Sequence, residues 1–244
     1  MSKMFTNSFA GSRKGFDTGL RQYMLKIYNL MAAALVLSGA MAYAFATIPA
    51  LTSLIFVVNP NGSLGYSALG YIAAFAPIGI AFYFFWGNAS MTIQRAQSLF
   101  WIYAALTGVS LASLGFIYTG ASIAKTFFIT ASMFGGMSIY GYTTNKDLTS
   151  MGSLLFVGLI TIILASIVNI FMQSPAVEFA VSILGIIIFL GLTAYDTQRL
   201  KEIYYSAGGG EYAQKMAIVG AFILYLDFIN LFIYLLRFLG VRKE

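Results

Sequence analysis

Seven long, largely apolar stretches separated by short polar connections dominate this sequence. They cover residues 28–48, 66–86, 98–118, 121–142, 151–172, 177–198 and 216–239. A helix needs about 20 apolar residues to cross the hydrocarbon core of a bilayer, where every backbone N–H and C=O group must be satisfied within the protein. The pattern therefore predicts an all-α, polytopic membrane protein with seven transmembrane helices.

The charged residues agree with this organisation. Only 9% of the residues are charged and 59% are hydrophobic, whereas a soluble domain is about one-quarter charged. We expect a tail over residues 1–27, one compact helical domain over 28–240, and a short C-terminal tail over 241–244. The net charge of +6 is not gathered on a soluble domain, so the sequence does not predict nucleic-acid binding.

The distribution of basic residues predicts the orientation in the membrane. No Lys or Arg lies in the first connection, 49–65, whereas the N-terminal tail contains Lys3, Arg13, Lys14, Arg21 and Lys26. Basic segments remain on the cytoplasmic side, so we expect a cytoplasmic N-terminus. With seven spans, a cytoplasmic N-terminus places the C-terminus on the opposite side of the membrane, although its basic residues favour the cytoplasm. A cytoplasmic C-terminus with one re-entrant window is therefore an alternative.

Small residues recur at helix-packing intervals. They are Gly108 and Ala112 in one window, and Ala131, Ser132, Gly135 and Gly136 in the next. Such residues allow helix backbones to approach closely. We favour packing within one bundle over a dedicated dimer face.

Two residue types are absent, and their absence excludes much chemistry. The chain has no cysteine and no histidine, which rules out disulfides, thiolate metal sites, cysteine nucleophiles and imidazole bases. There is also no phosphate-binding glycine loop. We expect a protein that is not an enzyme and holds no cofactor.

One carboxylate lies within the last apolar window. In "ILYLDFINLFIYLLRF", residues 223–238, Asp227 shares one helix face with Asn230 and Tyr234. A carboxylate at the centre of a membrane helix costs roughly 2.5 to 3.5 kcal/mol on insertion scales, so it must face protein or water. Intramembrane carboxylates are most often functional. The alternative is a polar stripe that only joins helices through hydrogen bonds.

A second carboxylate ends the preceding window, in "GLTAYDTQRLKE". Asp196 alone would be an interfacial residue paired with Arg199 or Lys201. Beside Asp227 it would form a like-charge pair that shares a proton near neutral pH. Arg95 is a candidate counter-ion. The predicted spans leave the two aspartates offset by roughly 10 Å along the membrane normal.

Several functions remain possible for such a pair. Asp196, Asp227 and Asn230 provide oxygen ligands suited to weak, transient calcium binding, as in a permeation pathway. An intramembrane aspartyl protease is an alternative, since "AYD" followed by an aspartate in the next helix resembles the arrangement in such proteases. Those proteases carry a Gly-x-Gly-Asp motif at the second aspartate, however, whereas this chain reads "LYLD" there. A retinal protein is excluded, because no lysine lies between Lys215 and Lys243. A carrier stays open.

Three segments resemble one known family. They are "LYLDFINLFIYLLRFLG" (224–240), "GLTAYDTQRLK" (191–201) and "ALTGVSLASLGFIYTGASIAKTFFITASMFGGMSIYGYTTNKDL" (105–148). Together they resemble the Bax-inhibitor family, in particular its bacterial inner-membrane branch.

The resemblance implies a seven-helix fold whose last helix lies at the centre. It also implies a pH-sensitive calcium leak in which Asp196 and Asp227 form the gate. The family has a basic residue at the end of the second helix, whereas Arg95 is displaced toward the third. Some bacterial relatives are associated with a membrane-anchored AAA protease, which makes an interaction protein that modulates such a protease the main alternative.

Overall fold

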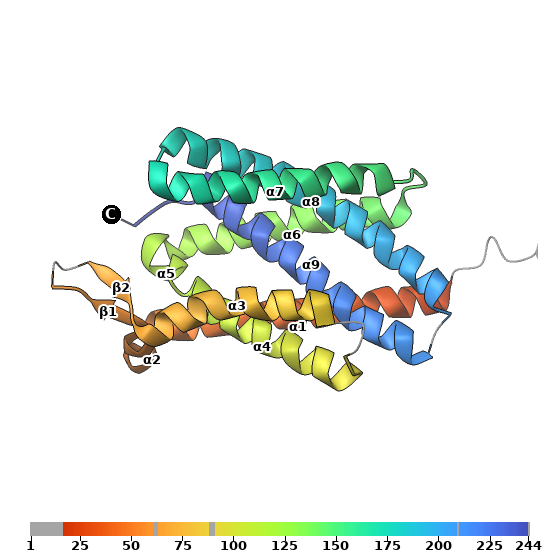
Figure 1. The fold of residues 1–244 in the computed structure, drawn as a ribbon, viewed down its shortest axis with the longest axis horizontal. Helices are drawn as coiled ribbons and strands as arrows, with labels where there is room; N and C mark the ends of the chain where they lie inside the picture. The colour runs from red at the N-terminus through yellow and green to blue at the C-terminus, as the bar shows by residue number, and fades with distance from the viewer. Residues whose placement is uncertain (1–16, 61–62, 88–90, 209, 244) are drawn as a thin grey trace, which may run out of the picture.

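Long helices run side by side along one axis of the molecule (Figure 1). The computed structural model describes residues 17–60, 63–87, 91–208 and 210–243. The helices are α1 (Thr18–Thr47), α2 (Pro49–Ile55), α3 (Ala68–Gly87), α4 (Ile93–Leu111), α5 (Leu114–Ile117), α6 (Gly120–Thr143), α7 (Thr149–Met172), α8 (Pro175–Ala207) and α9 (Gly210–Leu239). Two short strands, β1 (Phe56–Val58) and β2 (Leu64–Tyr66), pair antiparallel.

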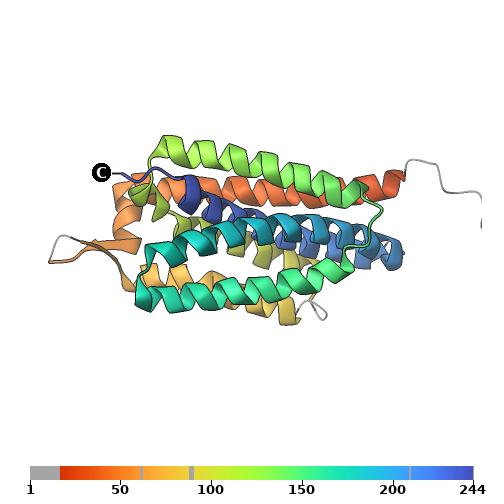
Figure 2. The same cartoon turned by 90° about the horizontal axis from the view of Figure 1, so that it is seen from above.

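Six of these helical segments are long and apolar enough to cross a membrane. They are α1, α3, α4 together with α5, α7, α8 and α9. The window 121–142 does form a helix, α6, which lies alongside the others (Figure 2). Lys125 and several Ser, Thr, Gly and Tyr residues lower its hydropathy. The prediction of seven spans is therefore not confirmed, whereas the polytopic, all-helical class is.

The first connection has structure that the sequence pattern did not predict. Ile48 ends α1, and Pro49 occupies the first position of α2, where a missing N–H costs nothing. β1 and β2 then form a hairpin with Phe56 opposite Tyr66, whose rings lie 5.2 Å apart. This hairpin is a small departure from the all-α class.

Several helices extend beyond the predicted apolar windows. α1 begins at Thr18, where the side chain of Asp17 accepts a hydrogen bond from the Leu20 N–H at 2.9 Å. Residues 18–27 of the predicted tail are therefore helical, and residues 1–16 lie outside the described residues. α8 continues past residue 198 to Ala207, because charged residues leave the membrane core without ending the helix.

The central element is α9, as the family resemblance implied. In its most apolar stretch 72% of the residues are buried, against 39% or less in the other five candidate spans. α9 packs against α1, α4, α6 and α8, and crosses the middle of the bundle in Figure 1. Phe222 of α9 also stacks on Phe84 of α3, with ring centroids 4.2 Å apart.

The two ends of the bundle differ in what they contain. The start of α1, the α6–α7 connection and the α8–α9 turn lie at one end, called here the amino end (Figure 1). The β-hairpin, α5 and the C-terminal residues lie at the other, the carboxy end. There, the Lys243 N–H donates to the Ile117 carbonyl at 2.9 Å. The described chain thus starts and finishes at opposite ends, unlike the re-entrant alternative.

Candidate functional site

Asp196 and Asp227 lie on the closely packed pair formed by α8 and α9. Gly208 ends α8 in the left-handed conformation with φ of +65°, and α9 runs antiparallel to α8 from Gly210. Leu200 packs on Gly220, and the ring of Tyr234 packs on Gly185. Between these two contacts Asp196 comes to the level of Asp227.

The axial offset expected from the windows is overcome in two ways. Side chains of a helix lean toward its N-terminus. In an antiparallel pair, the Asp196 side chain therefore leans away from the connecting turn and the Asp227 side chain leans toward it. The helices are also longer than their apolar windows, so the centre of each window does not mark the centre of each helix.

The two carboxyl groups interact with each other inside the protein. Asp196 is 8% exposed and Asp227 is 4% exposed. They act on one another electrostatically and through a side-chain hydrogen bond. No N–H or hydroxyl group of the described residues donates to Oδ2 of Asp227. Because ionised carboxylates only accept hydrogen bonds, a bond between the two requires that one of them carries a proton.

The basic residues that follow Asp196 have separate roles. The charge of Arg199 acts on Asp196, although the Arg199 side chain is exposed. Lys201 instead donates through Nζ to the Tyr142 carbonyl at 2.9 Å, near the end of α6. Gln198 fixes the α6–α7 connection: its side chain accepts from the Leu148 N–H at 2.9 Å and donates to the Lys146 carbonyl at 2.8 Å.

The three supporting residues named from the sequence do not join the aspartate pair. Asn230 donates through Nδ2 to the Leu226 carbonyl of its own helix at 2.8 Å. The ring of Tyr234 lies 5.8 Å from that of Phe189, and its hydroxyl interacts with Ser166 of α7. Arg95 is exposed in the first turn of α4, and no described interaction joins it to either aspartate.

A chain of hydroxyl groups beside Asp196 was not predicted. The hydroxyl of Tyr28, on α1, bonds to Ser138 Oγ on α6. Ser138 Oγ in turn lies 3.0 Å from Thr197 Oγ1, one residue after Asp196. Serine, threonine and tyrosine are common in membrane helices and carry no charge, so they do not stand out in an apolar window. The only signal for these hydroxyl contacts in the sequence is that Thr197 follows Asp196 directly.

A polar pocket lies on the carboxy side of the aspartate pair. Its volume is about 770 Å³, and its polar lining includes Ser166, Asn169, Glu178, Arg237 and Arg242. Arg242 pairs with Glu178 at 3.5 Å. Along α9, Tyr234, whose ring packs on Gly185, lies between Asp227 and Arg237 of this pocket.

The carboxylates of the described residues do not form a strong metal site. No cluster of three or more Asp, Glu, His or Cys side chains occurs among them. Calcium takes six to eight oxygen ligands in tight sites. Asp196 and Asp227 can therefore offer at most a weak, partly hydrated site.

Comparison with known proteins agrees with this architecture. Residues 20–244 match the model of the family described as "Inhibitor of apoptosis-promoting Bax1". The chain is 52% identical to an uncharacterised protein of Rickettsia prowazekii, over 98% of both chains. It is 42% identical to the inner membrane protein YbhL of Escherichia coli K12, over 92% of this chain and 94% of the relative.

These matches span nearly the whole described chain, including α8, α9 and both aspartates. The family match and the relatives, which are more than 40% identical, extend over the whole helical bundle rather than over one part of it. The chain therefore belongs to the Bax-inhibitor family of multi-pass membrane proteins.

Proposed function

We propose that this protein is a pH-sensitive leak for calcium or similar cations, gated by Asp196 and Asp227. The observation that supports the proposal most strongly is the contact between two buried carboxyl groups on the central helix pair. Intramembrane carboxylates in contact are costly to maintain, and they mark ion pathways and proton relays in membrane proteins.

The proposed gate depends on how many protons the pair holds. With one proton, the carboxyl groups share a hydrogen bond and hold α8 and α9 together. Without a proton, two negative charges repel each other and offer oxygen ligands to a cation. The charge of Arg199 on α8 acts on Asp196. The hydroxyl chain of Tyr28, Ser138 and Thr197 ends at the residue that follows Asp196.

The proposed path continues toward the carboxy end. Tyr234 on Gly185 would form the barrier between the pair and the polar pocket, where Glu178 and Arg237 lie. A weak two-carboxylate site releases its ion readily, as permeation requires. The pathway uses no energy source in this proposal, so flux would follow the existing gradient.

We further propose that the protein acts in the bacterial inner membrane with its amino end in the cytoplasm. The E. coli relative is named an inner membrane protein. Among the described residues, seven Lys and Arg lie toward the amino end: Arg21, Lys26, Arg95, Lys146, Arg199, Lys201 and Lys215. Four lie toward the carboxy end: Lys125, Arg237, Arg242 and Lys243. This asymmetry favours a cytoplasmic amino end.

We propose no catalytic role for the pair. Leu226 and Phe228 flank Asp227, and α8 covers it, so a peptide substrate would have to displace a packed helix. No calcium cofactor is needed in this scheme, since calcium is the permeant ion.

The proposal is tested by calcium flux into liposomes that contain the purified protein and a trapped dye, at pH 6 and pH 8. We expect the wild-type flux to differ between the two pH values and Asp227→Asn to abolish the difference. Asp196→Asn should behave in the same way, because either substitution removes the pair of like charges on which the proposed gate depends.

Asp147→Asn is the matched control. Hydrogen bonds from the Thr149 hydroxyl and backbone N–H lower the pKa of Asp147. Its stabilising effect is therefore present above the pKa of the unfolded chain and lost only as the pH falls toward the lower, folded value, well below pH 6. The control should keep the wild-type pH response.

The alternative function, a modulator of a membrane protease, predicts another outcome. The folded protein would show no flux at either pH, and a membrane protease would co-purify with wild type and with Asp227→Asn alike.

A further inference from the structure

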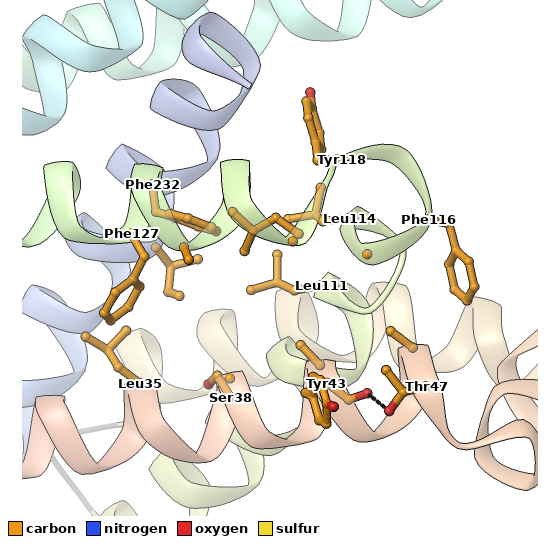
Figure 3. A pocket seen from close by; sticks show the side chains of 18 of the residues that line it. Leu35, Ser38, Tyr43, Thr47, Leu111, Leu114, Phe116, Tyr118, Phe127 and Phe232 are labelled. Atoms are coloured by element: carbon orange, nitrogen blue, oxygen red, sulfur yellow. Dashed lines mark hydrogen bonds between the residues drawn. The ribbon is translucent and has the colours of Figure 1, made fainter. Parts of the chain in front are cut away.

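An apolar groove opens on the side of the bundle at its carboxy end (Figure 3). We call it the lateral groove. Its volume is about 600 Å³, and it lies among α1, α4–α5, α6 and α9. Apolar side chains form its walls and floor, among them Leu35, Leu111, Phe127, Phe228 and Phe232. Neither aspartate lines this groove, which borders the polar pocket at Leu111, Leu114 and Tyr118.

The lateral groove is open toward the membrane. Tyr43 of α1 and Phe128 of α6 stand on its rim and are 73% and 69% exposed. Gly39 on one wall and Gly120 on the other have no neighbouring atom within 4 Å of the position a Cβ would take. The groove therefore has unfilled space at the level where lipid chains surround the helices.

The length of the groove matches one leaflet of a bilayer. Its α1 wall runs from Leu35 to Thr47, and 12 helical steps of about 1.5 Å cover roughly 18 Å. One leaflet contributes about half of a hydrocarbon core that is about 30 Å thick. An acyl chain that enters from the carboxy side can thus lie along the whole groove.

A positive charge stands at the polar end of the groove. Lys243 lines it there, and its Nζ donates to the Gly115 carbonyl. The backbone of Lys243 is held by the Ile117 carbonyl, and Val241 N–H donates to Ser122 Oγ at 2.9 Å. The ammonium group has three donors, so it can bind a lipid phosphate while it keeps the bond to Gly115.

The N-terminal segment of this chain is an unsuitable occupant. Residue 17 lies at the amino end of α1, 18 residues before Leu35. A segment that precedes it would have to cross the bilayer to reach Lys243.

We propose that the lateral groove is a binding site for one acyl chain of an anionic phospholipid, whose phosphate is held by Lys243. The site belongs to the leaflet at the carboxy end. Its occupant contacts Phe228, Ile229 and Phe232 of α9 and so completes the packing of the central helix.

Titration of delipidated protein in detergent, followed by native mass spectrometry, tests this proposal. The probes are dioleoyl phosphatidylglycerol, dioleoyl phosphatidylcholine and oleate. We expect one phosphatidylglycerol per chain, bound about fivefold more tightly than phosphatidylcholine, which is the effect of one basic residue on an anionic lipid. Lys243→Gln should remove this preference. Lys125→Gln is the control, because Lys125 is exposed on α6 near the carboxy end but does not line the groove.

Filling the groove tests the acyl-chain part. Gly39→Leu should weaken binding of both phospholipids, whereas Gly79→Leu should not, since Gly79 also faces open space but lies on α3, away from the groove. Gly120→Leu fills the opposite wall and replaces Gly39→Leu if that variant elutes as aggregate. Equal binding by Gly39→Leu and Gly79→Leu would overturn the proposal. So would oleate binding without phosphatidylglycerol binding, or a protein dimer that Gly39→Leu abolishes in the absence of lipid.

Discussion

Ser38 joins three helices through one hydroxyl group. Its Oγ lies 2.9 Å from the Ala34 carbonyl of α1, 2.7 Å from the Ala104 carbonyl of α4 and 2.7 Å from the hydroxyl of Tyr225 on α9. Both Ser38 and Tyr225 are buried. This small polar group therefore ties the central helix to two of the helices that surround it.

We predict that Ser38→Ala destabilises the protein by about 1 kcal/mol, the net worth of a hydrogen bond in a protein or membrane interior. The buried Tyr225 hydroxyl loses this partner. The measurement is reversible unfolding in micelles, with Ser53→Ala as control, because Ser53 bonds only within α2 and is exposed. Equal stability of the two variants would contradict the expected role of Ser38.

Residues of the candidate site differ in how well the sequence predicted them. Asp196 and Asp227 could be singled out from the sequence, because a charge within an apolar window has a high energetic cost and so requires an explanation. Asn230 and Tyr234 share the predicted face, but helical periodicity does not state which group a side chain bonds. Asn230 bonds its own helix. The contact between the aspartates depends on helix tilt and length, which periodicity does not contain.

At the scale of helices, close backbone contact occurs at single glycines. A Cβ added at Gly141 of α6 would lie 2.9 Å from the Cα of Ala194 on α8. One added at Gly108 of α4 would lie 2.8 Å from the Cα of Ser38 on α1. In contrast, Gly135 and Gly136 have open space around them. The prediction that small residues mark close helix contacts is therefore confirmed for Gly108 and wrong for Gly135 and Gly136.

We predict that Gly141→Ala destabilises the protein by about 1 to 3 kcal/mol, because α6 and α8 must separate to admit the methyl group. Gly136→Ala, five residues earlier on α6, makes the same chemical change in open space and should cost nothing through packing. Thermal unfolding of the two variants in the same detergent compares them. Because Ala has the higher helix propensity, a loss of stability in Gly136→Ala as large as that in Gly141→Ala would contradict the role assigned to the contact between α6 and α8.

At the scale of the whole molecule, the described chain begins and ends on opposite sides of the bundle (Figure 1). Because the natural sequence has no cysteine, single cysteines can report each side without background. We predict that a membrane-impermeant maleimide labels Asn59→Cys, in the β-hairpin region, in spheroplasts. Asn145→Cys, in the α6–α7 connection, should react only after the membrane is opened. Labelling of both before opening would contradict this topology.

The overall architecture was largely predictable, since apolar length and the requirement to satisfy backbone groups leave few alternatives in lipid. The β-hairpin was not, because its pairing depends on a short connection outside the apolar windows. The prediction of seven spans is not confirmed, because α6 has the length of a span and lies beside the others but is less apolar than the six candidate spans. Its polar residues, such as Thr126 and Thr130, are buried against other helices.

The central position of α9 has a consequence for biosynthesis. Chains are made from the N-terminus at about 5 to 20 residues per second, so α9 leaves the ribosome after every helix against which it packs. Until then α1, α4, α6 and α8 have no common partner along the faces that α9 covers. A nascent or truncated chain that lacks residues 210–239 has the outer helices but not the central helix α9. Its outer helices must then stay in the membrane without the contacts that α9 makes with them.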